Sequence, residues 1–565
     1  MSLYYFLKFF LFKRNIIFFL FVTKVIFFAL FEMIGIFLLV TLITILSGNH
    51  NSQFVEKFFI IVENITSLDL SNITNLSLIT LSFYLFKAVY SIYFIRYQQT
   101  KIANAHRSFC NKIFENYASG DNRLTRKFKS YELIRNINFV SDKVFGEYCV
   151  SIFNLITEAT VVAVLFTTFV LIDFKLAIGL LIIGYLIIKI LTKLIFSKSE
   201  IIGQKSLNAY GELIHIVNIT IGLFKELRLL KLLNIFKKNF NNTVTKYVEA
   251  KKYDNYISRI PVVVIELFVV TVIVFLIIFQ LNGEQKFVEA IPKLSLFAIG
   301  IARLTPSINR ISTNLHTIKF YTPSVMSLMF DYHFLNKANQ DNVFVKKVKF
   351  KKLITFKNVD LAVFGEVVLN KINFTIKKGE KVLIYGASGS GKTSIINILS
   401  GFSPYDGGCI LIDEKIQKHK IELINPISLV SQENNLINNE TIYYNVTKKN
   451  KKKSFKDKKF NEITKICDLE KFINYTTNKE HNIISENAKN ISGGEKQRIC
   501  IARSLYSDFD ILLMDEPFSS IDKLSSDKIF KKILTKFKTK TIVIVSHQNV
   551  NEKFIDKIIK VKKND

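Results

Sequence analysis

Residues 381–394 read KVLIYGASGSGKTS, and this stretch decides the fold of the C-terminal part of the chain. The run KVLIY predicts a buried strand, and the apolar run that follows Ser394 predicts a helix. Between them stands the pattern G-x-x-x-x-G-K-[ST], whose glycines let backbone N–H groups surround phosphate oxygens at a helix N-terminus. We therefore expect a nucleotide-binding loop made of Gly386, Ala387, Ser388, Gly389, Ser390, Gly391, Lys392, Thr393 and Ser394.

A second apolar run, DILLMDE (510–516), predicts another strand, which ends in two acids. Asp515 fits a Mg²⁺ ligand, together with the hydroxyl of Thr393, while Lys392 is expected to reach the β- and γ-phosphates. Glu516 fits a general base that activates the attacking water. The two strands together predict hydrolysis of a nucleoside triphosphate.

The octapeptide ISGGEKQR (491–498) stands about 20 residues before the second strand. It resembles the L-S-G-G-Q signature of ATP-binding cassette (ABC) proteins. Gln432 in LVSQENN, the tetrapeptide SSID (519–522) and His547 in IVIVSHQ match further motifs of that family, in the family's order. The resemblance covers about 345–565 and implies an α/β P-loop nucleotide-binding domain, with ATP and Mg²⁺ as cofactors.

The same resemblance implies roles for six more residues. The nucleotide-contacting set gains Ser492, Gly493, Gly494 and Asp522, and the catalytic set gains Gln432, which also binds Mg²⁺, and His547. The signature residues open a helix whose N-terminus faces a γ-phosphate.

Two positions depart from the family pattern. Glu495 replaces the usual glutamine of the signature, at a position outside the phosphate contacts, so we expect activity to survive. The adenine-stacking aromatic is usually a tyrosine about 25 residues before the phosphate loop. Ungapped counting places Val363 there, and Phe364, one residue later, is our candidate.

The part of the chain before about residue 340 is far more apolar, and the whole chain has 49% hydrophobic residues and a mean hydropathy of +0.26. Runs of about 20 apolar residues can span a bilayer. The sixth run is weaker than the others because it contains Glu289, Pro292, Lys293 and Arg303. The predicted spans are about 15–47, 75–97, 149–172, 174–196, 257–281 and 286–310. We therefore expect an α-helical membrane domain at 1–330, a linker at 331–344 and the cassette domain at 345–565.

Lysine and arginine collect before the first span and in the loops at about 98–148 and 197–256. The positive-inside rule then places both termini and the ATP-binding domain in the cytoplasm, and the resemblance implies a bacterial inner membrane. The long inner loops are expected to continue the spanning helices beyond the bilayer. The segment 52–65 of the first outer loop has an amphipathic helical pattern that includes Phe54 and Phe58. A simple hydrophobic cap on the outer ends of the spans stays an alternative.

The formal net charge of +31 raises nucleic acid as a partner, but no recognition motif accompanies it. The positive net charge is explained by a composition rich in lysine, asparagine and isoleucine and by the basic residues that flank the spans. The cysteines form no C-x-x-C pair, so neither a zinc site nor a disulfide framework is expected. They are Cys110, Cys149, Cys409, Cys467 and Cys500.

Six spans followed by one cassette resemble an exporter half-transporter. In that family the signature of one subunit completes the site formed by the phosphate loop of the other. A homodimer with two competent sites is the natural expectation, because Glu516 and His547 are both present. A heterodimer with an unlike partner stays open.

The cargo is the least determined feature. Four basic residues lie in or beside the spans, and they either line a cavity for an anionic head group or pair between helices, as Arg259 could with Glu266. These are Lys87, Arg259, Arg303 and Arg310. The stretch SLFAIGIARLTPSINRI (295–311) resembles the flippases that move polyprenyl-diphosphate-linked oligosaccharides for protein N-glycosylation. Phe54 and Phe58 would then hold the polyprenyl tail.

Other functions share this architecture. An exporter of peptides, lipids or small toxic compounds is the main alternative. An ATP-gated channel or regulator is disfavoured because Glu516 and His547 are intact. A nucleic-acid-linked cassette ATPase is incompatible with six spans.

Overall fold

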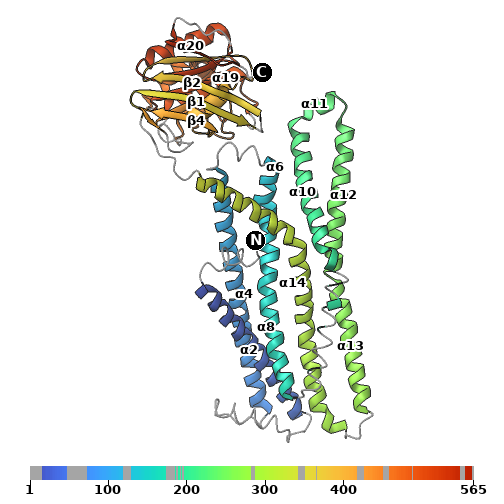
Figure 1. Ribbon diagram of the computed structural model, residues 1–565. Coiled ribbons are helices and arrows are strands. Elements are labelled where there is room, and N and C mark those ends of the chain that lie inside the picture. Colours follow the sequence, from blue (N-terminus) through green and yellow to red (C-terminus); the bar gives the residue numbers. More distant parts are fainter. Residues whose placement is uncertain are drawn as a thin grey trace. The chain divides into compact units, whose positions relative to one another are not determined.

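The structure is a computed structural model in which the chain forms two compact units, divided between Lys337 and Ala338 (Figure 1). The described residues are 15–46, 73–118, 129–172, 178, 185, 189–190, 193, 196–281, 287–341, 350–363, 366–416, 426–449, 457–476, 478–485, 488–547 and 554–562.

The first unit is helical, and α2, α4 and α8 pack together while α10 packs along α12 (Figure 1). Its elements are α2 (Asn15–Leu46), α4 (Ile73–Ala118), α6 (Ser130–Ile134), η2 (Arg135–Val140), α7 (Ser141–Lys143), η3 (Val144–Cys149), α8 (Val150–Ile172), η5 (Phe196–Lys198), α10 (Ser199–Gly222), α11 (Phe224–Leu229), α12 (Leu233–Ile257), α13 (Ile260–Leu281) and α14 (Phe287–Asp341). The core between α2, α4 and α8 is aromatic, with Phe21, Phe109 and Phe153 almost fully buried.

Within the described residues, three helical stretches are long and apolar enough to cross a membrane: Phe18–Leu39, Ile73–Ala118 and Ser130–Thr167. They coincide with the first three predicted spans. The fourth predicted span and the outer-loop segment 52–65 lie largely or wholly outside the described residues. α13 and α14 occupy the ranges of the fifth and sixth.

Several helices are much longer than a bilayer requires. α4 has 46 residues and is therefore about 70 Å long at 1.5 Å per residue, whereas a hydrocarbon core is about 30 Å thick. α10 and α12 fill most of the inner loop expected at about 197–256, in agreement with the predicted continuation of the spans. α14 runs to Asp341, so most of the stretch expected as a linker is helical.

A buried polar cluster fixes three of the long helices to one another. His316 of α14 is fully buried, with Nδ1 3.0 Å from Ser199 Oγ and Nε2 3.2 Å from Asp254 Oδ1. One helical turn after Ser199 in α10 stands Gly203. A Cβ atom placed on Gly203 would lie only 1.9 Å from the carbonyl oxygen of Phe320 in α14. The backbones of α10 and α14 therefore approach each other as closely as glycine allows.

The second unit contains two sheets. The antiparallel sheet has the order β2-β1-β4-β5, and the parallel sheet has the order β6-β7-β8-β3-β9. The strands are β1 (Leu353–Val363), β2 (Glu366–Lys377), β3 (Lys381–Tyr385), β4 (Gly407–Ile412), β5 (Lys415–Ile416), β6 (Ile427–Val430), β7 (Ile511–Asp515), β8 (Thr541–Ser546) and β9 (Lys557–Lys560). The helices are α15 (Lys392–Leu399), α16 (Ile442–Thr447), α17 (Lys458–Ile466), α18 (Glu470–Tyr475), η7 (Lys479–His481), α19 (Gly493–Tyr506) and α20 (Lys523–Lys536).

The parallel sheet is covered on both faces, which is why its central strands are continuous apolar runs. β7 is buried along its whole length, and Leu512 packs into one core cluster while Leu513 packs into another. Asp515 is paired with Val545 across β7 and β8, and Tyr385 is paired with Ser546 across β3 and β8. The carboxyl ends of these strands therefore meet at one edge of the sheet.

We predict that Gly203→Ala destabilises the helical unit, because the added methyl group would clash with backbone atoms of Phe320 that cannot rotate away. A loss of about 2 kcal/mol or more is expected for such overpacking. Gly146→Ala is the matched control, since no atom lies within 4 Å of its Cβ position and alanine is favoured in a helix. Thermal unfolding of both purified variants should show a lower melting temperature for the first only. Equal melting temperatures would contradict the close approach.

Candidate nucleotide-binding site

The phosphate loop leaves β3 after Tyr385 and enters α15 at Lys392. Gly389 and Gly391 have φ angles of +81° and +89°, a backbone region that strongly favours glycine. A Cβ atom on Gly391 would lie 2.6 Å from Leu369 Cδ2, so this position also lacks room for a side chain. The glycines found in the sequence are therefore required by the shape of the loop.

Lys392 is buried and curls over the loop, where its ammonium group donates to the carbonyl oxygens of Gly386 (3.0 Å) and Ala387 (2.7 Å). The hydroxyl oxygen of Ser390 is buried and has no hydrogen-bond partner in the described part of the chain. Ala387, Ser388 and Gly389 are exposed at the top of the loop. The loop is therefore suited to a polyphosphate. The ammonium group of Lys392 supplies positive charge, the hydroxyl of Ser390 is available for a hydrogen bond, and the exposed top of the loop is open to a ligand.

Asp515 ends β7 beside this loop and is only 2% exposed. Burial raises the pKa of its carboxyl group and the charge of Glu516 adds to the rise, while a hydrogen bond from Thr393 and the charge of Lys392 oppose it. Its Oδ1 atom is buried and accepts no hydrogen bond among the described residues. Oxygen atoms of Asp515 and Thr393 are thus available together, and they are the type of ligand that Mg²⁺ prefers.

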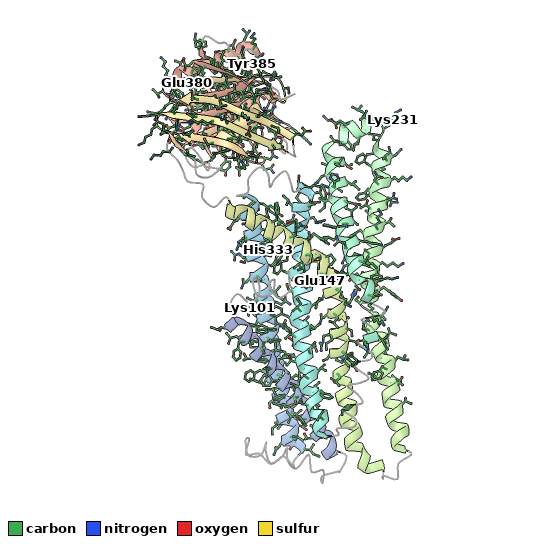
Figure 2. All side chains as sticks on the ribbon, in the orientation of Figure 1. Lys101, Glu147, Lys231, His333, Glu380 and Tyr385 are labelled. Carbon is green, nitrogen blue, oxygen red and sulfur yellow. The ribbon has the colours of Figure 1, made fainter. Side chains whose placement is uncertain are left out.

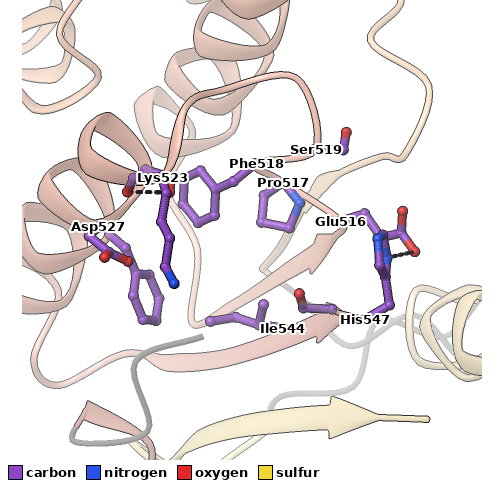
Figure 3. A pocket seen from close by; sticks show the side chains of 11 residues that line it. Glu516, Pro517, Phe518, Ser519, Lys523, Asp527, Ile544 and His547 are labelled. Carbon is purple, nitrogen blue, oxygen red and sulfur yellow. Dashed lines mark hydrogen bonds and ion pairs between the residues drawn. The ribbon is translucent and has the colours of Figure 1, made fainter. Parts of the chain in front are cut away.

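Glu516 and His547 form a contact pair at the ends of β7 and β8 (Figure 3). His547 Nδ1 lies 3.0 Å from Glu516 Oε1, and both side chains are reachable by solvent, at 50% and 20% exposed. The φ angle of Glu516 is +46°, which is unusual for a residue other than glycine, and its N–H donates to Val545 at 3.0 Å. The carboxylate is held in one orientation beside a group that can donate a proton, as a general base for water requires.

A cavity of about 260 Å³ opens beside this pair. Its lining includes the apolar side chains of Phe518, Phe530 and Ile544. The charged side chains of Lys523 and Asp527 also line it (Figure 3). Its volume holds several water molecules, so the carboxylate of Glu516 borders both protein and solvent.

The signature sequence caps α19. Glu495 N–H donates to Ser492 Oγ (3.3 Å), and Ser492 N–H donates to Glu495 Oε2 (2.9 Å), which together make a capping box. A glutamine can make the same capping box, so the glutamate that replaces the family's glutamine keeps this contact. No hydrogen bond joins Ser492, Gly493 or Gly494 to the phosphate loop within the described residues.

Gln497 contacts the turn after Glu516, and the sequence did not assign it a role. It is 1% exposed, and its Nε2 donates to Glu516 O and to Ser519 Oγ, both at 3.1 Å. Its Oε1 accepts from Ser520 N–H at 2.7 Å. Gln497 thus fixes the backbone on both sides of the turn that follows Glu516. In the sequence, only its position two residues after the signature pointed to a role for Gln497.

The remaining predicted nucleotide-site residues lie near this edge or at helix ends. Gln432 is exposed just after β6, the neighbour of β7. The chain beyond it is held by Arg503, whose guanidinium donates to Asn435 O (2.9 Å) and to Asn445 O (2.8 Å). Asp522 caps α20, and the hydrogen bond from Ser525 N–H lowers the pKa of its carboxyl group. Phe364 lies outside the described residues.

The predicted cargo residues are not brought together as free cations. Lys87 pairs with Glu32 between α4 and α2 (2.9 Å), and Arg310 pairs with Glu158 between α14 and α8 (2.8 Å). Arg259 is exposed in the turn between α12 and α13. The side chains of Arg303, Phe54 and Phe58 lie outside those described.

Comparison with known proteins gives a family match at the site. Residues 369–519 match the family described as "ABC transporter". Over the whole chain, the fold is similar to that of a bacterial Atm1-family ABC exporter with ATP bound, at a TM-score of 0.75 and 16% identity, covering 98% of this chain and 95% of the other.

Two kinds of transporter are similar in sequence. The ATP-dependent lipid A-core flippase of Francisella novicida is 25% identical over 445 residues, which cover 77% of this chain and 73% of the flippase. A lacticin-481/lactococcin-DR transport/processing ATP-binding protein of Lactococcus lactis is 29% identical over 293 residues. That match covers 51% of this chain and 40% of the lactococcal protein, so the chain matches less than half of that relative's length.

We predict that Glu516→Gln retains nucleotide binding and lowers ATP hydrolysis by about 100-fold or more, because the general base is lost. Lys392→Ala should weaken nucleotide binding instead, since a charge-assisted contact disappears. Steady-state turnover and equilibrium binding of a fluorescent ATP analogue separate the two effects. Near-normal turnover of Glu516→Gln would remove Glu516 from this role.

A second prediction concerns Gln497. Gln497→Ala should lower kcat for ATP roughly tenfold with little change in KM, because the base is mispositioned while the phosphate loop is untouched. Ser519→Ala, which removes one of the three hydrogen bonds, should have a smaller effect in the same direction. A parallel rise in KM, or a drop in melting temperature that accounts for the loss, would instead indicate a purely structural role.

Proposed function

We propose that this chain, which has the fold of an ABC exporter half-transporter and carries an ABC transporter ATPase domain, is one of two identical subunits of a membrane transporter driven by ATP. Its membrane is a bacterial inner membrane, with both termini and the ATPase domain on the cytoplasmic side. Its cargo is a polyprenyl-diphosphate-linked oligosaccharide or a similar lipid-linked glycan.

One observation carries the ATP-driven part of the proposal. A glycine-shaped phosphate loop, the buried Asp515 and the Glu516–His547 pair share one edge of a sheet, in a chain whose other unit contains membrane-length apolar helices. Mg²⁺ supplies charge neutralisation to the phosphates when it is bound, and Thr393 and Asp515 would hold it. Lys392 binds phosphate oxygens. Glu516 accepts the proton of the attacking water, and His547 keeps the carboxylate in position.

The position of the signature supports the proposed dimer. Ser492, Gly493 and Gly494 present the N-terminus of α19, a site suited to phosphate, and no hydrogen bond joins them to the phosphate loop of their own chain within the described residues. A second copy would supply a phosphate loop to this helix end and receive one in return. Each chain would thus contribute its phosphate loop to one ATP site and its signature to the other.

The lipid cargo is supported by the match to lipid A-core flippases. An alignment over 445 residues is longer than the ATPase domain, so it extends well into the helical unit. A sugar head group cannot cross apolar lipid alone, because each hydroxyl that loses water without a new hydrogen bond costs about 2–7 kcal/mol. Because Lys87 and Arg310 are paired with acids, Arg259 is the cation proposed for the diphosphate, and Arg303 stays a candidate from the sequence alone.

A peptide exporter is the second candidate, and it is favoured by the similarity to the lactococcal transport/processing protein. The test uses the full chain in proteoliposomes with a panel of lipid-linked oligosaccharides, lipid A-type glycolipids and peptides. We expect lipid-linked glycans to stimulate ATP turnover and to change leaflet, with Glu516→Gln as the inactive control.

Neutralising Arg259 should lower translocation while basal ATP hydrolysis persists. Stimulation by peptides alone would overturn the lipid cargo and support the peptide exporter. Absence of ATP hydrolysis in a folded, dimeric preparation would overturn the transporter assignment itself.

A further inference from the structure

We propose that α2 and α4, where Lys24 packs against Tyr93 and Tyr97, form a binding site for the phosphate of an anionic phospholipid of the surrounding membrane. The site, called here the α2–α4 cation site, consists of Lys24, Tyr93, Tyr97 and Lys101. It is distinct from the ATP site and from the cargo residues considered above, and it does not depend on which cargo is carried.

Lys24 is held in a fixed position by aromatic groups. Its ammonium group lies 3.8 Å from the ring centre of Tyr97 and 4.6 Å from that of Tyr93, and it donates to the Tyr93 hydroxyl oxygen at 2.5 Å. Tyr90 donates to the backbone oxygen of Lys24 at 3.0 Å. The ammonium of Lys101 lies 5.5 Å from the same Tyr97 ring, so one ring has two cations around it. Figure 2 shows Lys101 on α4.

Lys24 and Lys101 differ from Lys87 and Arg310 in that none of the described carboxylates pairs with them. Lys87 and Arg310 each pair with a glutamate at less than 3 Å. No carboxylate forms an ion pair with Lys24 or Lys101 in the described part of the chain. Aromatic faces compensate an ammonium group only in part, so the site retains positive charge at a membrane surface, where charge without a partner is expensive.

The site lies at one end of the apolar region. Lys24 stands about two helical turns inside the Phe18 end of the span Phe18–Leu39. α4 runs antiparallel to α2, since Tyr84 donates to Gly35 O whereas Tyr90 donates to Lys24 O. Tyr93 is half-exposed and is followed by exposed Ile95, so the site opens outward rather than into the core. Tyrosine and lysine at this depth are suited to the level of lipid head groups.

The donors present match a phosphodiester. Because the Tyr93 oxygen accepts from Lys24, its own O–H proton is free to point away from Lys24 and to be donated to a ligand oxygen. Lys24 retains further N–H donors, and Lys101 adds a second charge. A lipid phosphate has acceptor oxygens for these donors and a negative charge for the cations, while its acyl chains would lie along α4.

The test exploits the absence of tryptophan from this sequence. Val89 is exposed one turn deeper into the membrane than Tyr93, and it lies outside both the site and the ATP machinery. Val89→Trp introduces a single fluorophore at the depth of acyl chains. The full-length variant is reconstituted in bilayers that contain acyl-brominated phosphatidylglycerol or acyl-brominated phosphatidylcholine, and quenching gives the relative affinity of the two lipids.

We expect phosphatidylglycerol to bind about fivefold or more tightly than phosphatidylcholine. The attraction between one lysine and an anionic lipid accounts for a preference of this size. Lys24→Gln in the same background should remove this preference, and Tyr93→Phe should reduce it. Tyr97→Phe, which keeps the ring beside Lys24, is the matched control and should leave the preference unchanged.

Equal quenching by the two lipids, or a preference that survives Lys24→Gln, would overturn the proposal. Suppression of the preference by millimolar inorganic phosphate would show that the site takes any phosphate and would overturn its assignment to the membrane lipid. Retained ATP hydrolysis by each variant verifies that the protein is folded.

Discussion

The parallel register of β3, β7 and β8 is the constraint on which the rest of the ATPase unit depends. It pairs Asp515 with Val545 and Tyr385 with Ser546, so the phosphate loop, Asp515 and the Glu516–His547 pair come together where these strands end. The continuous burial of β7 and β8 fixes that register, because a shift of one residue would move apolar side chains out of the cores on both faces.

α19 connects this edge to the signature. Its N-terminus carries the capping box of Ser492 and Glu495, and two residues later Gln497 holds the turn after Glu516. If a bound phosphate displaced the signature, Gln497 would therefore also move the backbone around Glu516 in the same chain. Cys409, Cys467 and Cys500 are free thiols, so this unit depends on packing and hydrogen bonds rather than on disulfides.

Much of the ATPase unit could be predicted from the sequence, because its motifs stand at strand ends and the pattern of each strand is strong. The phosphate loop, Asp515, Glu516 and His547 were found in this way. Gln497 could not be, since its role depends on a turn 19 residues away in sequence that only tertiary packing brings close. The partners of Lys87 and Arg310 were equally hidden, because helix pairing selects which glutamate each cation meets.

The central claim is that each ATP site is completed by a second copy of the chain. Disulfide cross-linking between two copies tests it most directly. One copy carries Ser388→Cys, the other carries Ser492→Cys, and the two copies carry tags of different size. The account predicts an ATP-dependent cross-link that joins both tags, because the loop of one chain faces the signature of the other. Absence of that product in the presence of ATP, with a cross-link only within a chain that carries both substitutions, would contradict it.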